Sequence, residues 1–543
     1  MTRFLINHWV RVMVVASFIL AAGCTPVDRW SVYADKVEYE RLPVGPDLKV
    51  EPVELQIEDG LSPLSAVLAD QPIKLSVEQA VMMALTNNRD LQVERHGPVI
   101  TGTFELIERG DFDPELFAEV EYFRERSSES SRSTGEQFDV AAEETSGIVG
   151  LRQTLPTGTT VEASLEQERS ISNRAPEQQT ARAGLSVTQS LLRGFGPAAN
   201  LASVRQAELD TLASRYQLRG FAEALLSETE IAYWNFVLAR EEIAIYEESL
   251  AVARKQKEEV ELRIEVGILP EIEVAAARAE EALRMQALID GRSQLEDRRL
   301  RLLRMISPSP AGQLNQQLAA VSELRLHARP IVDLEDRLLL AEQSRPDLNE
   351  ARLRLQQRRL ETVVTRNGVL PKLDLFFSLG KTGYGTTFSD SFNKMDGKTY
   401  DLTAGIQLSH LIGDRAGDAK NLAARASRQQ AREAVANLRQ LVEYEVRIAA
   451  NEVERTRQQI DATRATRAFQ EQSLKAEKER FDVGTGTALL VAQAQRDLLE
   501  SQIAEIEAVV DYRVALVQLY LAEGSLLERR GVTLSRDVTG YYR

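Results

Sequence analysis

Two kinds of hydrophobic spacing alternate along the chain, and together they predict a protein that combines very long helices with strands. Apolar residues at helical spacing run from about Asn200 to Val266, which as one helix would be about 100 Å long. A second long helical pattern ends at Phe481. Since no globular core can bury such a rod along its length, both helices need partner helices. A tight turn and a further helical pattern follow each of them, so the sequence predicts two helical hairpins.

Between the helical stretches, apolar and polar residues alternate with a period of two, which predicts strands with one apolar face. Four such runs lie in the first half of the chain and two in the second, at about 115–122, 149–155, 161–166, 185–191, 373–379 and 402–409. The polar stretches between them, among them 127–145, are expected to be loops. Soluble sandwiches have the same alternation, so the pattern by itself does not decide what meets the apolar face. Beside long helices it fits a lipid-facing outside and a wet lumen.

The two halves of the chain repeat each other in order, which indicates a tandem duplication. Residues 480–497 resemble residues 263–280 at an offset of 217, and each stretch is expected to contain a hairpin tip at a Val-Gly pair. Upstream, residues 345–348 echo residues 88–91 at an offset of 257. The first half therefore has 40 residues that the second lacks, and nearly all of them fall in the strand region. The surplus predicts one extra β-hairpin.

The first residues are typical of an export signal that ends at a lipid-modified cysteine. The apolar run from Val12 to Ala22 precedes Cys24, and Leu20-Ala-Ala-Gly-Cys24 resembles a bacterial lipobox with Ala21 in place of a large aliphatic residue. A plain secretory signal or a membrane anchor is the alternative, but 11 apolar residues are too few to span a bilayer. As the only cysteine, Cys24 can form no internal disulfide. We therefore expect it to carry a lipid anchor.

Composition and charge exclude several classes of function. The net charge is −16, and removal of the signal makes the chain more acidic, so no basic surface is available for nucleic acid. Hydrophobic residues make up 43% of the chain but aromatic residues only 6%, which is typical of long helices. The four histidines are scattered, and no metal-ligand spacing or nucleophile arrangement occurs, so we expect no enzyme, no cofactor and no metal site.

These features divide the chain into six parts. They are a lipoprotein signal peptide (1–23), a lipidated tether (24–74), a first repeat with four strands and a hairpin tip at 266–270 (75–310), a linker (311–332), a second repeat with two strands and a tip at 483–487 (333–530) and a C-terminal tail (531–543). Six strands are too few to enclose a channel, since the narrowest barrels need about eight. The sheet is therefore expected to close with other subunits.

In these motifs the chain resembles the TolC-like outer-membrane efflux family. The resemblance rests on Leu75 to Leu91 and its repeat at Leu334 to Leu348, on strand pairs that begin at a proline, and on the two hairpin tips. It implies a mixed α and β membrane protein: a trimeric β-barrel in the cell outer membrane, continuous with a long α-helical barrel in the periplasm. The family's role implies a passive exit channel of a tripartite efflux or type I secretion system. A periplasmic membrane-fusion adaptor would connect such a homotrimer to an inner-membrane pump.

The resemblance assigns the two tips to contact with the adaptor. The residues are Val266, Gly267, Ile268 and Leu269 in the first tip and Val483, Gly484, Thr485, Gly486 and Thr487 in the second. The glycines permit the positive φ that a sharp turn needs. The simpler interpretation is that they only terminate helices. That interpretation explains the glycines but not the similar flanks of two separate hairpins.

The resemblance also implies a periplasmic gate, formed here by Glu273, Phe481, Leu490 and Gln493. Family members often have arginine at the position of Gly486, and acidic residues ring the closed aperture of the best-known member where this chain has Leu490 and Gln493. An aperture lined by Leu490 would be held shut by apolar packing more than by charge. The alternative for Glu273 is a solvated surface position.

Three questions remain open at the level of sequence. A structural lipoprotein, a coiled-coil scaffold of the cell envelope without a pore, would explain the helices and Cys24 but not six strands that alternate apolar with polar residues. Within the channel interpretation, the cargo could be small molecules, proteins or metals. The family's usual four strands give 12 in a trimer, whereas six strands give 18, and the sequence does not decide whether the extra hairpin joins the barrel.

Overall fold

The computed structural model describes residues 72–130, 133, 135–307, 313–322 and 328–532. These residues form two compact units, which are described separately: the first comprises 101–210 and 354–432, the second 72–100, 211–353 and 433–532. The predicted signal peptide, Cys24, most of the tether and most of the tail lie outside the described residues. In the described part of the chain, no helix combines the length and the apolar character of a membrane span.

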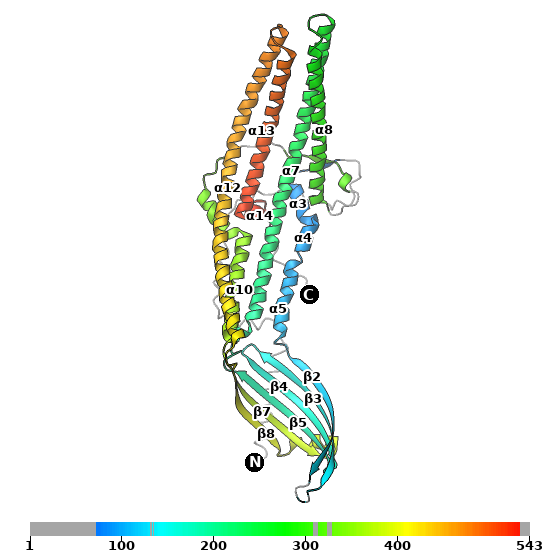
Figure 1. Cartoon of the computed structure of the whole chain (residues 1–543), viewed down its shortest axis with the longest axis vertical. Helices are drawn as coiled ribbons and strands as arrows, with labels where there is room; N and C mark the ends of the chain where they lie inside the picture. The colour runs from blue at the N-terminus through cyan, green and yellow to red at the C-terminus, as the bar shows by residue number, and fades with distance from the viewer. Residues whose placement is uncertain (1–71, 131–132, 134, 308–312, 323–327, 533–543) are drawn as a thin grey trace. The chain divides into compact units, whose positions relative to one another are not determined.

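The first unit contains one antiparallel sheet of six strands, in the order β2-β3-β4-β5-β7-β8 (Figure 1). The strands are β2 (Glu115–Ser130), β3 (Gln137–Leu155), β4 (Thr159–Ser172), β5 (Ala175–Ser190), β7 (Lys372–Gly385) and β8 (Tyr400–Ser409). The pairing of β5 with β7 joins the strands of the two halves of the chain. Four strands in the first half and two in the second match the number expected from the alternation.

The predicted loop at 127–145 is wrong, because both strands of that hairpin continue into it. Ser130 is paired with Gln137, so the connection spans only residues 131–136. The polar stretch after Leu165 is likewise mostly strand, whereas after Leu379 the strand β7 continues only to Gly385 and the rest of the connection to β8 is not strand. In these outer parts polar side chains occupy both faces, so the period-two contrast disappears although the backbone ladder continues.

Helix ends flank the sheet within the first unit. They belong to α5 (Gly97–Gly110), α6 (Pro197–Asn200), α7 (Ala202–Glu265), α10 (Pro346–Gly368) and α12 (Arg415–Asp482), of which α5, α7, α10 and α12 extend into the second unit. Asn200, the last residue of α6, connects this helix to the turn between β3 and β4. Its Nδ2 donates hydrogen bonds to Pro156 O (3.0 Å) and Gly194 O (2.9 Å). Arg354 forms an ion pair with Asp210 at 2.7 Å.

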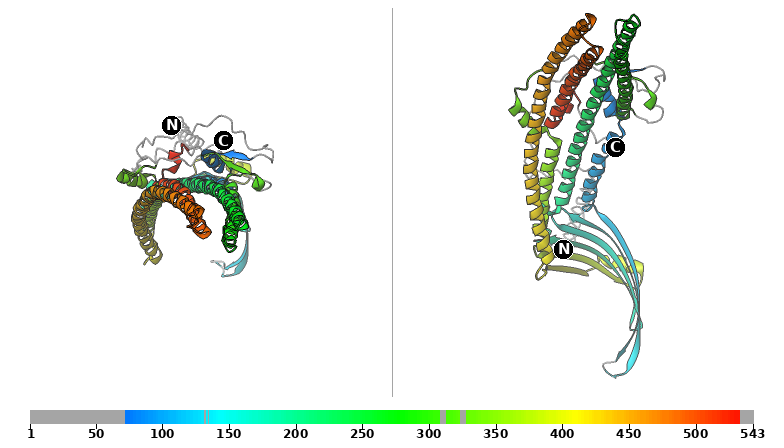
Figure 2. Two further views of the ribbon diagram at one scale, coloured as in Figure 1. Left: turned by 90° about the horizontal axis from the view of Figure 1, so that it is seen from above. Right: turned by 45° about the horizontal axis from the view of Figure 1, so that its top comes forward.

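The second unit is formed by helical hairpins. Besides its parts of α5, α7, α10 and α12 it contains α3 (Val77–Asn87), α4 (Arg89–Glu94), α8 (Glu273–Ile306), α9 (Leu334–Ser344), α13 (Ala488–Glu523) and α14 (Leu526–Arg529). Seen along their length, the long helices α7, α8, α12 and α13 follow an arc (Figure 2). Buried side chains such as Val446 and Val453 on α12 pack against Tyr512 and Leu519 on α13. The long helices thus bury their apolar residues against each other, as their length requires.

The helical stretch before the first strand of the six-stranded sheet is divided into α3, α4 and α5. Asn88 lies between α3 and α4 with extended backbone, and its side chain accepts a hydrogen bond from Leu91 N (3.1 Å). In the second repeat, the last long helix ends at Gly524, whose φ of +66° terminates α13 before the short helix α14. The caps at Asn88 and Gly524 are local features within otherwise helical patterns, so the hydrophobic periodicity does not reveal them.

A short parallel pairing of β1 (Ile73–Leu75) with β6 (Leu318–Ala320) was not predicted. It places the predicted linker 311–332, which also contains the turn η2 (Gln313–Asn315), against the start of the first repeat. The buried Tyr233 secures it, because its hydroxyl donates to Leu75 O (2.9 Å) and accepts from Ser322 N (3.2 Å). Strands of three residues are too short to give a periodic signal in sequence.

Candidate functional site: the paired hairpin tips

The two hairpin tips have the same backbone hydrogen bonds at positions 217 residues apart. In the first tip, Val266, Gly267, Ile268 and Leu269 donate to the carbonyls of Leu262, Ile264, Arg263 and Arg263, at 3.1, 2.9, 2.8 and 3.2 Å. In the second tip, Val483, Gly484, Thr485 and Gly486 donate to those of Glu479, Phe481, Arg480 and Arg480, at 3.2, 3.1, 2.9 and 3.0 Å. The two stretches therefore fold into the same turn.

A glycine in the left-handed region makes this turn possible in both tips. The φ angle is +77° at Gly267 and +79° at Gly484. Nothing lies within 4 Å of the place where a Cβ would stand at either position, so the requirement is conformational and not steric. This agrees with the role that the sequence predicts for both glycines.

The tips expose apolar side chains to solvent in the single chain. Val266 (67%), Ile268 (70%) and Val483 (74%) are exposed, whereas Leu269 is half-buried. The second tip leads directly into α13, because Thr487 Oγ1 accepts from Leu490 N (3.4 Å) as an N-cap. In the first tip, α8 begins at Glu273 without a side-chain cap.

Behind the tips, an apolar cluster joins the two hairpins. We call it the tip cluster; its buried residues are Val260 on α7, Ala277 on α8, Phe481 on α12, and Ala488 and Val491 on α13. Ile264, Leu269 and Leu474 pack against it. Because all four long helices contribute, the ends of the two hairpins share one small core.

Arg263 links the hairpins at the edge of the tip cluster. Its Nη2 lies 2.7 Å from Asp482 Oδ1 on the other hairpin and 2.5 Å from Glu259 Oε1 on its own helix, and its guanidinium lies 4.8 Å from the centroid of the Phe481 ring. The hydrogen bond to Asp482 raises the pKa of Arg263 further above its usual range. Arg480, its counterpart 217 residues later, forms an ion pair within its own helix, with Glu477 at 2.7 Å, and none with the other hairpin among the described residues. The bridge is therefore made by one of the two repeats only.

The predicted gate residues occupy different environments in the single chain. Phe481 is 5% exposed inside the tip cluster, Glu273 is half-buried at the start of α8, and Leu490 and Gln493 are exposed on α13. The contact of Phe481 with Arg263 was not predicted, because the two residues are far apart in sequence and only packing brings them together. The role of these four residues as a gate remains a prediction.

Further from the tips, α8 and α13 enclose charged groups that sequence reasoning also missed. Glu280 and Arg284 are both buried on α8 and form an ion pair of 2.5 Å, while Arg496 on α13 approaches Glu280 at 3.7 Å. A pair of opposite charges four residues apart is common on exposed helix faces, so the sequence alone gives no sign of burial. Such a pair needs both partners, since removal of one leaves a buried charge.

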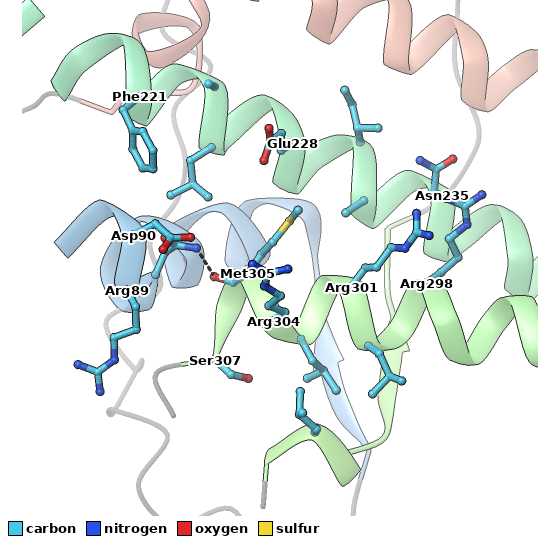
Figure 3. A pocket seen from close by; sticks show the side chains of 18 residues that line it. Arg89, Asp90, Phe221, Glu228, Asn235, Arg298, Arg301, Arg304, Met305 and Ser307 are labelled. Carbon is cyan, nitrogen blue, oxygen red and sulfur yellow. Dashed lines mark hydrogen bonds between the residues drawn. The ribbon is translucent and has the colours of Figure 1, made fainter. Parts of the chain in front are cut away.

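A groove of about 1160 Å³ lies in the second unit between α4, α7 and the end of α8 (Figure 3). Four arginines line it: Arg89, Arg298, Arg301 and Arg304. Its acidic members, Asp90 and Glu228, come from different helices and do not form a metal-binding set. Among the described residues, no group of three or more His, Cys, Asp or Glu side chains could hold a metal ion.

A sheet with one apolar face and long helical hairpins with paired glycine tips define a class of protein, the outer-membrane channels that combine strands with long helices. The model of the outer membrane efflux protein family matches residues 338–525 of this chain. The TolC-like recognition made from the sequence is thus confirmed. The proteins of this family and the structural neighbours are channels and not enzymes.

Curated relatives and solved structures agree with this assignment. The chain is 25% identical over 350 residues to outer membrane efflux protein BepC of Brucella suis, covering 64% of this chain and 73% of the relative. It is 25% identical over 370 residues to outer membrane protein TolC of Vibrio cholerae, covering 66% and 80%. The fold matches the CmeC outer membrane channel of Campylobacter jejuni with a TM-score of 0.61 at 19% identity, covering 83% of this chain and 86% of that one.

Proposed function

We propose that this protein is the outer-membrane exit channel of a tripartite efflux or type I secretion system and conducts substrates passively from a periplasmic adaptor and pump to the exterior. The observation that carries the proposal is the sheet, which has one face that suits lipid and one that suits water. The names of the relatives, which include a pyoverdine export protein of Pseudomonas putida, agree with transport across the outer membrane. The cargo of this chain is not specified by these similarities.

The strand register aligns apolar side chains on one face across the whole sheet. One row contains a residue from each strand, paired in sequence across neighbours: Leu116, Leu151, Ala163, Leu185, Leu379 and Leu402. Residues directly opposite each other share a face, so the six side chains form one continuous band. Leu116 (72% exposed) and Leu402 (58%) show that no described residue covers this band at its edges.

The other face of the sheet is polar. The adjacent row consists of Glu115, Arg152, Glu162, Ser186, Ser378 and Thr403. Arg152 forms an ion pair with Glu162 at 2.8 Å, and Arg182 forms one with Asp401 at 2.8 Å. These charges favour water on this face, as in the lumen of a channel.

The height of the apolar band fits a membrane. Measured along β7, its rows run from that of Leu373 to that of Gly383, which is about 33 Å of strand at roughly 3.3 Å per residue. Lys381 on this face of β7 is charged, but its row contains Ala183, Leu165, Val149 and Ala118 on the neighbouring strands. With the tilt of about 40° that is usual in membrane barrels, this length of strand corresponds to about 25 Å, the height of the apolar band of such barrels. The band therefore supports a sheet that crosses the outer membrane.

The two edges of the sheet support assembly into a homotrimer. Within the described residues, β2 and β8 each have a single partner strand, so each leaves a row of backbone groups that needs a partner in lipid. All six strands are hydrogen-bonded in one sheet, including the extra hairpin of the first repeat. We therefore infer a closed barrel of 18 strands from three subunits, with the extra hairpin inside its wall.

The exposed apolar tips support docking to a periplasmic membrane-fusion adaptor, and through it to an inner-membrane pump. Val266, Ile268 and Val483 present similar side chains on the same turn in both hairpins, so one kind of adaptor surface could recognise both tips. The lipid anchor at Cys24 belongs to the same proposal. The competing function, a non-conducting scaffold lipoprotein of the cell envelope, does not require the continuous apolar and polar faces of the sheet.

The proposal is tested by reconstituting the purified protein without its signal peptide into planar bilayers, together with the mass of the detergent-solubilised oligomer. A stable trimer with discrete pore currents supports the exit channel. A monomer or dimer without conductance that still partitions into outer membranes supports the scaffold. Within the channel, Leu490→Ser is expected to increase the open fraction if apolar packing holds the gate shut, whereas its exposed neighbour Leu489→Ser serves as the matched control.

A further inference from the structure

The connection between β7 and β8 folds back onto the apolar face of the sheet. It comprises residues 386–399, which we call the cap, and contains α11 (Phe388–Asn393) and η3 (Lys394–Asp396). The cap contacts β5 and β7, which are interior strands of the sheet. The cap is therefore packed against the sheet.

Two glycines on β7 leave the space into which the cap packs, and we call this place the seat of the cap. A Cβ at Gly383 would overlap with Ser391 O, and one at Gly385 would lie 2.6 Å from Ser391 N, so no larger residue fits at either position. Ser391 is completely buried, and its Oγ lies 2.8 Å from Phe388 O and 3.3 Å from Gln167 Oε1 on β4. The backbone of the cap therefore rests directly on the strands.

The seat lies where the apolar band ends. Gly383 is in register with the fully buried Ala181, and Lys381 with Ala183, so both glycines belong to the same face as the band. The next row along the strands, that of Gly385, contains Gln179 on β5 and Arg169 on β4. The cap consequently covers the boundary between the apolar rows and the polar rows.

At this level the edges of the sheet carry aromatic side chains, but the middle does not. Tyr122 on β2 (61% exposed) lies in the same row as Gly385, and Tyr400 on β8 (71% exposed) lies in the row of Lys381. The cap adds Phe388, which is 60% exposed and lies 4.8 Å from the ring of Phe392. Phe388 thus stands where strands β4, β5 and β7 offer no aromatic residue on this face of the sheet, since Tyr384 of β7 lies on the opposite face.

We propose that the cap is a membrane anchor that inserts Phe388 and Phe392 among lipids at the boundary between headgroups and acyl chains. Aromatic side chains are favoured at that depth, and they form girdles at the ends of the apolar band in outer-membrane barrels. The cap completes such a girdle across the middle of the sheet. The inference rests on the proposed function, since it assumes that the apolar band faces lipid.

Site-directed labelling tests the depth of the cap. In a Cys24→Ser background, an environment-sensitive fluorophore is attached to Phe388→Cys, to Leu379→Cys in the apolar band and to Phe138→Cys near the end of the β2–β3 hairpin, and each protein is reconstituted into phosphatidylethanolamine–phosphatidylglycerol vesicles. Nitroxide lipids labelled near the headgroup are expected to quench the Phe388 probe about twofold more than those labelled deep in the chains. Deep nitroxides should quench the Leu379 probe, and aqueous iodide the Phe138 probe.

The outcomes separate this inference from the proposed function. If lipid nitroxides quench the Leu379 probe but only iodide reaches the Phe388 probe, the cap is an aqueous loop and the anchor is refuted. Protection of the Phe388 probe from both quenchers would also refute it, because another protein surface would then cover the cap. If the Leu379 probe itself meets no lipid, the membrane assignment of the sheet fails. As a second test, Gly383→Val should unseat the cap and expose the Phe388 probe to iodide.

Discussion

Removal of the Phe481 side chain should loosen both hairpin tips, although Phe481 belongs to only one of them. The side chain is 5% exposed, and truncation of a buried phenylalanine to alanine typically costs about 3–5 kcal/mol. Loss of the contact with the Arg263 guanidinium adds about 0.5–1 kcal/mol. Because the tip cluster takes residues from all four long helices, this cost should fall on the ends of both hairpins.

Hydrogen exchange measured by mass spectrometry resolves this effect by segment. A loss of about 4 kcal/mol in local stability corresponds to an increase of roughly a thousandfold in the opening constant, at about 1.4 kcal/mol per factor of ten. In Phe481→Ala, we expect faster exchange in residues 474–491 and also in 260–277, with little change in the helices near the middle of the second unit. The assay requires the assembled protein in detergent or vesicles.

A matched control and a clear contrary result accompany this prediction. Phe469 lies on the same helix but is 69% exposed in the single chain, so Phe469→Ala should leave exchange at the tips unchanged. If Phe481→Ala accelerates exchange only in residues 474–491, the two hairpins do not share a core. The argument from the tip cluster would then be refuted, whereas an effect on both segments would show that the tips are energetically coupled.

Three further predictions concern single residues. Arg263→Gln should lower the stability of both tips in the same exchange assay by about 1–2 kcal/mol, whereas Arg480→Gln, which breaks only a pair within its helix, should have less than half that effect. Burial raises the pKa of Glu223 from 4.5 to about 7 despite Arg219 at 3.0 Å, so its contribution to stability is present below pH 4.5 and is lost as the pH rises through about 7. Glu223→Gln should remove a fall of about 3 kcal/mol over that range, measured as the pH dependence of thermal unfolding; an unchanged slope would contradict the assignment. Gly524→Ala should cost more than about 1 kcal/mol, because its φ is +66° and a Cβ would lie 2.9 Å from backbone atoms of Arg345, and an unchanged melting temperature would show that the α13–α14 junction relaxes freely.

The elements that can be predicted from the sequence alone are those with one apolar and one polar side, and turns that need a glycine. The six strands were evident because Leu116 and its counterparts alternate with charged residues, and the tips were evident because Gly267 and Gly484 recur in equivalent surroundings. Both signals are local, since a period of two or a turn glycine requires no knowledge of distant residues. The TolC-like resemblance followed from the order of these local signals.

Two kinds of feature could not be predicted from the sequence. They are strand segments without a contrast between an apolar and a polar side, and contacts between residues that are far apart in sequence. The outer parts of β2 and β3 are polar on both faces, so their length depends on the ladder of backbone hydrogen bonds between the strands. The burial of Phe481, its contact with Arg263 and the seating of the cap on Gly383 join residues from different elements. A periodic pattern records which face of an element is apolar, but not which other element will cover it, because that depends on packing across the whole fold.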